Sequence, residues 1–148
     1  MPTGEDARPA MLMVKPSWLI SEVSRLAHPL LAGQLAIAGS RGYHYRLLAA
    51  LAEFGPASQA SLGRHTGLDR SDVAAAVIEL AARGLVQRAP DPADRRRNVI
   101  SITPAGTAHL RRLDELLADV QDELLAPLSL AERQQLIRLL NRILEQDA

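Results

Sequence analysis

The sequence predicts a mainly α-helical fold with a small β component, of the α+β class, and three observations predict it. Aromatic residues make up only 3% of the chain, so the core is expected to consist of Leu, Ala, Val and Ile. Apolar residues recur at helical spacing in several stretches, and two short β-rich runs flank a turn rich in Pro and Asp. A chain of 148 residues suits a single domain, which buries roughly 68–70% of its unfolded surface.

The N-terminal segment is expected to be disordered. Residues 1–15 contain Pro2, Gly4 and Pro9 and show no periodicity. The segment is polar and carries charges of both signs, which argues against a secretory signal. No apolar run in the chain approaches the ~20 residues of a membrane span, so we expect a cytoplasmic protein with no membrane partner.

The first helix is predicted from Ser17. Its apolar residues follow four-three-four spacing on one face: Leu19, Val23, Leu26 and Leu30. An interior proline removes a hydrogen bond and clashes with the preceding turn. Pro29 therefore predicts a kink or break near His28, with a second helical piece that runs to about Ser40.

Two helices joined by a tight turn are predicted in the centre, after a helix over about 42–53 that ends at Gly55. Ser58 is placed to cap a short helix that closes at Gly67. Asp69 then caps a longer helix over 70–83, stopped by a glycine, whose inward face is Val73, Ala76, Val77 and Leu80. The connecting "HTGLD" is typical of a helix-turn-helix, although other helical hairpins share the pattern.

A β-hairpin is predicted directly after this unit. "LVQRA" (85–89) and "NVISIT" (98–103) are rich in β-forming residues and flank "PDPADRRR". A helix-turn-helix followed by a hairpin is a winged helix-turn-helix. The predicted winged core covers 41–104.

The C-terminal arm is predicted as two helices. Thr103 and Pro104 match a helix N-cap and first position, and an apolar stripe follows at Leu110, Leu113, Leu117, Val120 and Leu124. Pro127 breaks this helix, and a capping box from Ser129 to Glu132 opens a last helix, whose apolar side is Leu136, Leu139, Leu140 and Ile143. Arms at 16–40 and 105–147 have little to pack against in so small a domain, so we expect them to interlock in a homodimer; an intramolecular bundle is the alternative.

Charge and composition narrow the classes of function. The formal net charge is zero, but the central stretch between Pro56 and Pro104 holds seven arginines against five acidic residues. The chain has no cysteine, which excludes disulfides and thiol redox switches. The four histidines (28, 44, 65 and 109) show no metal-ligand spacing on one helix, so no metal and no cofactor are expected. No phosphate loop, nucleophile elbow or suitable carboxylate pair indicates an enzyme.

The wing carries a family resemblance. Asp94 to Thr103 fits the pattern D-x-R-x5-[LI]-T, and "GLDRSDV", "LAARGLVQRAPDPADRRR" and "SITPAG" stand around it in order. This succession resembles the MarR family of bacterial transcription regulators over residues 17 to 146, most specifically over 67–106. The resemblance implies a homodimer of winged helices that binds pseudo-palindromic double-stranded DNA and acts as a repressor. It also implies a small phenolic or anionic effector that releases the DNA.

Helix 70–83 would be the recognition helix in the DNA major groove. Its DNA-facing candidates are Arg70, Ser71, Asp72 and Ala75. Arg70 would pair with guanine; Asp72 would accept a bond from cytosine or else complete the helix cap. Positions 74 and 75 are alanine and position 79 is Glu79, so this helix has few side-chain hydrogen-bond donors for base edges. Contacts with thymine methyl groups, or readout of DNA shape, would have to take the place of such hydrogen bonds.

The wing would reach the adjacent minor groove through its arginines. The DNA-binding candidates there are Arg95, Arg96 and Arg97, and Asp94 would brace the signature Arg96. The candidates for phosphate contacts are Ser58, Arg64, His65 and Arg88, for which an ordinary solvated surface is the alternative.

Effectors of the family bind between the dimer arms and the winged core, which makes six residues candidates for an effector pocket: Trp18, Arg25, His28, Tyr43, His44 and Arg46. Arginine or histidine there would suit a carboxylate or phenolate, whereas a tryptophan such as Trp18 is more often a packing residue than a ligand contact. The alternative to the whole functional hypothesis is a winged-helix module for protein–protein contact with little DNA affinity.

Overall fold

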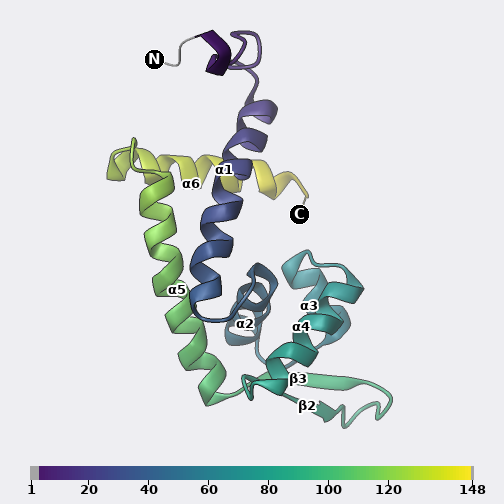
Figure 1. The fold of residues 1–148 in the computed structure, drawn as a ribbon. Helices are drawn as coiled ribbons and strands as arrows, with labels where there is room; N and C mark the ends of the chain where they lie inside the picture. The colour runs from purple at the N-terminus through teal and green to yellow at the C-terminus, as the bar shows by residue number, and fades with distance from the viewer. Residues whose placement is uncertain (1–3, 148) are drawn as a thin grey trace. The chain divides into compact units, whose positions relative to one another are not determined.

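The computed structural model describes residues 4–147, which form six α-helices, three short strands and 3₁₀ turns at both ends (Figure 1). The helices are α1 (Pro16–Ile37), α2 (Gly42–Phe54), α3 (Gln59–Thr66), α4 (Arg70–Ala82), α5 (Pro104–Leu124) and α6 (Leu130–Leu144). The strands are β1 (Ala57–Ser58), β2 (Val86–Pro90) and β3 (Asn98–Ile102). The predicted class, mainly helical with one small sheet, is confirmed.

The chain divides into two compact units. One unit, His28–Leu117, holds α2, α3, α4, the sheet and the adjoining halves of α1 and α5. The other comprises residues up to Ala27 and from Ala118 onward. The predicted division into arms (16–40 and 105–147) and a winged core (41–104) stays a prediction.

The N-terminal residues that the structure describes contain hydrogen-bonded turns. Gly4–Asp6 form a 3₁₀ turn, and the amide of Leu12 donates to the carbonyl of Pro9 at 3.0 Å. Residues 1–3 lie outside the described part of the chain. Disorder over 1–15 therefore also stays a prediction.

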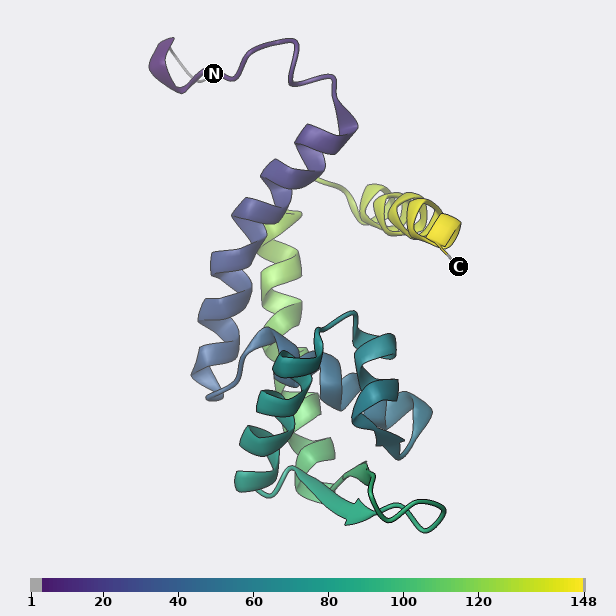
Figure 2. The ribbon, with the colours of Figure 1, turned by 90° about the vertical axis from the view of Figure 1, so that its right-hand side faces the viewer.

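The core of the larger unit lies where α2, α3 and α4 pack together, with the hairpin of β2 and β3 beyond them (Figures 1 and 2). Its largest fully buried side chains come from α2, α3, α4, β3 and α5: Leu47, Leu48, Leu51, Leu62, Leu80, Ile100, Leu113, Val73 and Val77. The predicted inward face of α4 is completely buried. Aliphatic side chains therefore fill this core, as the scarcity of aromatic residues predicts.

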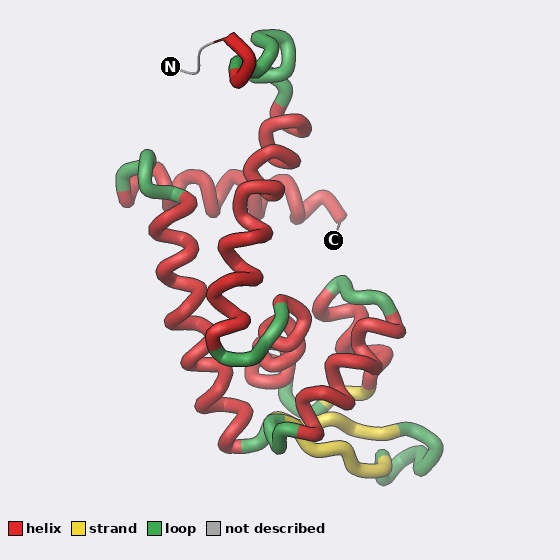
Figure 3. The backbone as a smooth tube through the Cα atoms, in the orientation of Figure 1, coloured by secondary structure: helices red, strands yellow, loops and turns green. Residues whose placement is uncertain are grey.

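The sheet has one strand more than the sequence predicts (Figure 3). Its order is β1-β3-β2, and both pairings are antiparallel, with Ala57 opposite Ile100 and Val86 opposite Ile102. A strand of only two residues is too short to show the alternation of apolar and polar residues, so β1 was not predicted. It ties the entry of α3 to the hairpin.

The predicted helix caps are present as hydrogen bonds. The side chains of Ser58 and Asp69 accept from backbone amides three residues later, at 3.2 and 2.9 Å. Thr103 does the same for Gly106 at 3.0 Å, and Ser129 forms the predicted capping box with Glu132. These caps are confirmed, and each satisfies an amide that the helix itself cannot.

The predicted break near His28 is wrong, because α1 runs without interruption from Pro16 to Ile37 with Pro29 inside it. Pro29 is exposed, and so is Arg25, whose carbonyl loses its donor and can bind water instead. On the other side of the helix, Leu31 and Leu35 pack against the core. The packing of Leu31 and Leu35 and the hydration of the Arg25 carbonyl therefore offset the hydrogen bond that Pro29 removes, and the helix continues.

A polar cluster joins the α1–α2 loop to α4 and α5. The guanidinium of Arg83 donates to the carbonyls of Gly39 and Ala38 at 2.9 and 3.1 Å, and contacts the hydroxyl of Ser40 at 3.3 Å. The same hydroxyl bonds Nε2 of His109 at 2.7 Å. Burial, followed by the charges of Arg83 and its other neighbours, lowers the pKa of the His109 imidazole.

We predict that His109 makes the protein less stable in mild acid. In the unfolded chain this histidine takes up a proton near its ordinary pKa of about 6.5, whereas the folded protein resists protonation. The stability is therefore present above about pH 6.5 and is lost as the pH falls towards the lowered folded pKa. His109→Gln should reduce the fall in the thermal unfolding midpoint between about pH 7.5 and about pH 5.5. His28→Gln, outside the cluster, is the matched control, and an unchanged slope in His109→Gln would contradict the prediction.

Candidate nucleic-acid interface

The first turn of α4 presents an exposed arginine and a closed cap. The Asp69 carboxylate accepts from the amide of Asp72 and from the hydroxyl of Ser71, at 2.9 and 2.8 Å. These bonds, that of the Asp72 amide first, lower the pKa of the Asp69 carboxyl. Arg70 is exposed beside them, at the helix end where its charge can meet an anion. The cap thus fixes where α4 begins and so where Arg70 lies.

The preceding helix, α3, faces α4 and carries further polar residues. Ser58 caps it, and Gly67 ends it in the left-handed conformation with φ of 70°, which allows the tight turn into α4. Arg64 is exposed on this helix. His65 stacks on Phe54, with ring centroids 4.1 Å apart. α3 therefore faces α4 across a short turn, as in a helix-turn-helix.

The wing tip is held by its own backbone and by Asp94. The amide of Asp91 donates to the carbonyl of Arg97 at 2.8 Å, which closes the tip. Asp94 accepts from the amide and the guanidinium of Arg96 at 3.1 and 3.2 Å, and lies 3.9 Å from Nε of Arg97. The Arg96 amide, the Arg96 guanidinium and the Arg97 charge, in this order, lower the pKa of the Asp94 carboxyl. A single carboxylate thus organises two arginines.

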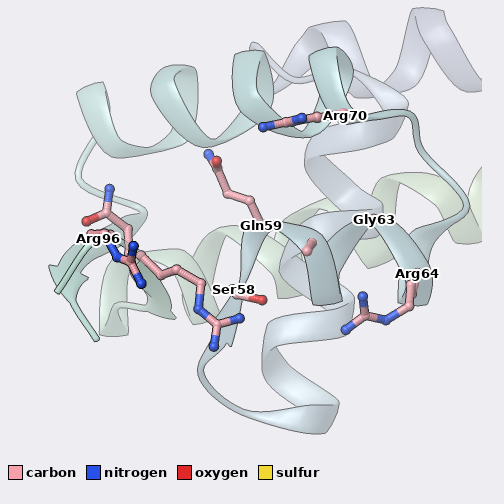
Figure 4. Close-up of a pocket in the computed structure, with 9 residues that line it drawn as sticks. Ser58, Gln59, Gly63, Arg64, Arg70 and Arg96 are labelled. Carbon is pink, nitrogen blue, oxygen red and sulfur yellow. The ribbon is translucent and has the colours of Figure 1, made fainter. Parts of the chain in front are cut away.

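These three elements enclose a groove of about 640 Å³. It is lined by Ser58, Gln59, Ala60, Gly63, Arg64, Arg70, Arg96, Arg97 and Asn98. In Figure 4, Gln59 rises from α3 toward α4, Arg70 lies along α4, and Arg96 lies on the wing side. Four guanidinium groups and no carboxylate line it, so the groove attracts anions.

The other DNA-facing candidates lie near the groove or on its margins. Ser71 and Ala75 are exposed on α4, and Asp72 is half-buried. Arg95 is exposed at the wing tip. Arg88, on β2, is exposed but does not line the groove. Gln59 and Asn98 also line the groove but were not predicted, because no motif marks them and only the folded wing and α3 bring them together.

Glu79 does not face outward as an isolated acid. Its carboxylate bonds Nε2 of His44 at 2.5 Å, and Nδ1 of His44 accepts from the amide of Arg41 at 2.9 Å. His44 is 4% exposed, so both its ring nitrogens are engaged inside the fold, where it caps α2. The pair joins α2 to α4, a contact 35 residues apart that sequence spacing does not reveal.

The six effector candidates are distributed over both compact units. Trp18 and Arg25 belong to the unit that ends at Ala27, and the others belong to His28–Leu117. Arg25 pairs with Glu22, and the hydroxyl of Tyr43 accepts from Arg41 at 2.6 Å. None of the six lines the groove or a second cavity of about 390 Å³ near Tyr45.

Among residues 4–147, no cluster of three or more His, Cys, Asp or Glu side chains is placed to hold a metal ion. None of the described helices combines the length and apolar character needed to cross a bilayer.

Comparison with known proteins places this geometry among regulators. A family model described as "MarR family" matches residues 40–97. The chain is 34% identical to the HTH-type transcriptional repressor NicR of Pseudomonas putida over 100 residues, which are 68% of this chain and 63% of that relative. The aligned part therefore spans less than two thirds of NicR.

Solved structures share the whole fold. A probable transcriptional regulator from Pseudomonas aeruginosa superposes with a TM-score of 0.79 at 34% identity, over 89% of this chain and 98% of that one. The PcaV transcriptional regulator from Streptomyces coelicolor, solved in complex with its natural ligand, superposes with a TM-score of 0.78 at 27% identity. That match covers 96% of this chain and 100% of PcaV.

Proposed function

The chain belongs to the MarR family, and from this we propose that it is a sequence-specific DNA-binding transcription regulator. It acts in the cytoplasm as a repressor, like the relative named as one, and binds a pseudo-palindromic operator as a homodimer. One observation carries the proposal: α3, α4 and the wing bring four arginines and no acid to one groove. Gel shift of the purified protein with its own upstream DNA at moderate salt tests it against unrelated DNA of equal length.

The division of labour on DNA follows from the elements. The N-terminal turns of α4 enter the major groove, and the wing arginines follow the adjacent minor groove, where narrow A·T-rich segments attract arginine. Ser58, at the start of α3, and Arg64, on its exposed side, contact phosphates. In the dimer, two such units bind half-sites about one helical turn, roughly 34–36 Å, apart.

The dimer is proposed from the apolar surface of the smaller unit. α6 has no buried residue, yet six large aliphatic side chains on it are 39% to 77% exposed: Leu130, Ile137, Leu139, Leu140, Ile143 and Leu144. In the same unit, Ile20, Val23 and Leu26 of α1 are about half exposed. Apolar surface of this extent marks an interface, and a second copy of the chain supplies a matching surface by two-fold symmetry.

We predict that Leu140→Glu with Ile143→Glu dissociates the dimer. Two carboxylates in an apolar interface would have to be desolvated without partners, and the free-energy cost of this exceeds the stabilisation that the remaining apolar contacts provide. Light scattering should give about twice the 16.0 kDa chain mass for the native protein and the chain mass for the variant. Gln135→Glu with Arg138→Glu, on the opposite side of α6, is the charge-adding control and should stay dimeric. A dimeric Leu140/Ile143 variant would contradict the proposed interface.

We also propose that a small aromatic or anionic effector weakens DNA binding, since the relative PcaV binds a natural ligand. Among the six effector candidates, Arg46 is exposed and provides a cationic side chain for a carboxylate or phenolate. A coupling of about 1–3 kcal/mol would lower DNA affinity about 5- to 150-fold.

A screen of aromatic acids should therefore find compounds that raise the unfolding midpoint and release DNA at the same concentration. Trp18 is the only tryptophan in the chain, so its fluorescence reports binding near it. Arg46→Ala should weaken the response without changing DNA affinity in the absence of effector. A screen in which no aromatic acid changes either quantity would count against an effector of this class.

One observation favours a second candidate function, a winged-helix module for protein contact. The exposed face of α4 carries Ile78, which is 57% exposed, where a DNA reader commonly carries polar groups. A protein that retains no DNA in the gel shift but captures a protein partner through α4 would support this alternative.

A further inference from the structure

The solvent-facing side of α4 is apolar at its centre. With 3.6 residues per turn, Ser71, Ala75 and Ile78 share one face, opposite the buried Val73 and Leu80. Ala75 is exposed and Ile78 is 57% exposed. An aliphatic side chain of this size is therefore presented at the middle of the proposed recognition helix.

Two polar side chains of α4, those of Ser71 and Glu79, are engaged elsewhere. The hydroxyl of Ser71 donates to the Asp69 carboxylate at 2.8 Å, and the carboxylate of Glu79 bonds His44 at 2.5 Å. Arg70 remains exposed, but at the first position of the helix. Beyond its first turn, α4 thus offers carbon atoms rather than hydrogen-bond donors to whatever it contacts.

The charges around this face indicate which partner covers it. Arg70 begins the same helix and lines the groove together with Arg64, Arg96 and Arg97. An apolar protein surface would leave these cations without partners, whereas duplex DNA places phosphates along both edges of its major groove. An apolar helix face beside an arginine-lined groove therefore matches DNA whose base edges include an apolar group.

We propose that α4 recognises thymine in the major groove through its 5-methyl group, with Ile78 and Ala75 as the specificity-determining residues. This inference rests on the proposed DNA-binding function and names what that site reads. Among the four bases, the 5-methyl group of thymine is the apolar feature of the major groove, and small apolar side chains contact it. Burying that methyl against Ile78 needs no hydrogen bond, which suits a helix whose residues beyond the first turn present only carbon atoms outward.

Uracil substitution tests the proposal, because uracil pairs like thymine and lacks only the methyl group. The probe is the tightest-binding duplex that the full-length protein selects from a random-sequence pool of about 30 bp, long enough for two half-sites. Each thymine of that duplex is replaced in turn by uracil, and affinities are measured by fluorescence anisotropy. Uracil at the contacted thymine should weaken binding about four-fold in each half-site and about 16-fold when both are replaced.

Side-chain variants assign the methyl contact to α4. Ile78→Ala should reduce the thymine-to-uracil affinity ratio, because only Ala75 remains of the two side chains proposed to cover the methyl. Ile37→Ala is the matched control: Ile37 is 60% exposed on α1, and its removal should leave the thymine-to-uracil ratio unchanged. Arg70→Ala should weaken both duplexes by the same factor and keep the ratio.

The outcomes separate this proposal from the function on which it rests. If no duplex in the pool is retained, both fail. If duplexes are retained but the native protein binds the thymine and uracil forms equally at every position, only the methyl readout is overturned. A ratio that survives Ile78→Ala unchanged would overturn the assignment to this face of α4.

Discussion

Replacing Arg95 and Arg97 with alanine is expected to abolish specific DNA binding without dissociating the homodimer. Arg97 lines the groove and lies 3.9 Å from Asp94, while Arg95 is exposed at the tip. Each charge-assisted bond to DNA contributes about 1.5–3 kcal/mol. Because a dimer has two wings, four such charges are lost, which amounts to about 6 kcal/mol or more, and affinity should fall by at least about 10⁴-fold.

The salt dependence gives this result a second readout. Four fewer phosphate contacts should reduce the steepness of log K against log salt by about 3.6. Arg111→Ala with Arg112→Ala removes the same charge from adjacent exposed positions on α5 and should leave both affinity and slope nearly unchanged. Binding by the Arg95/Arg97 variant at native strength would show that the wing tip does not hold DNA.

Gly106→Ala is expected to destabilise the fold by about 3 kcal/mol, because overpacking of a rigid site costs this much or more. A Cβ at this position would lie 2.0 Å from the carbonyl oxygen of Leu85 and 2.8 Å from Cγ1 of Ile102. The Leu85 carbonyl is held by the amide of Thr103 at 3.1 Å, so backbone must move rather than a flexible side chain. The unfolding midpoint should fall by about 10 °C.

Gly33→Ala is the matched control for this loss. Gly33 also lies within a helix, but a Cβ there would meet nothing within 4 Å, so alanine should be neutral or stabilising by about 0.5–1 kcal/mol. A Gly106→Ala variant as stable as Gly33→Ala would contradict the close packing of α5 on the hairpin. The glycine of "SITPAG" thus has a packing role that the motif alone does not explain.

The sequence predicts best what depends on neighbours along the chain. Ser58, Asp69, Thr103 and Ser129 are N-caps whose bonds close within three residues, so pattern and structure agree. Pro29 is also a local signal, but its effect depends on what surrounds α1. An exposed proline opposite a packed apolar face does not interrupt the helix, and no local rule could foresee that.

The site was predictable in part for the same reason. The wing arginines and Arg70 follow from a motif and a helix cap, both local. Gln59 and Asn98 line the groove only because β1 and β3 pair and bring the entry of α3 to the hairpin. The engagement of Glu79 by His44, which leaves α4 apolar outward, joins residues on two helices and lies beyond what spacing reveals.

The salt dependence of DNA affinity tests the central claim most directly. The native protein is titrated with the duplex upstream of its own gene at a series of salt concentrations. If the two arginine-lined grooves of a dimer neutralise about six to ten phosphates, log K should fall with log salt with a slope of about −5 to about −9. A slope near zero, or no binding at moderate salt, would contradict a DNA-binding regulator.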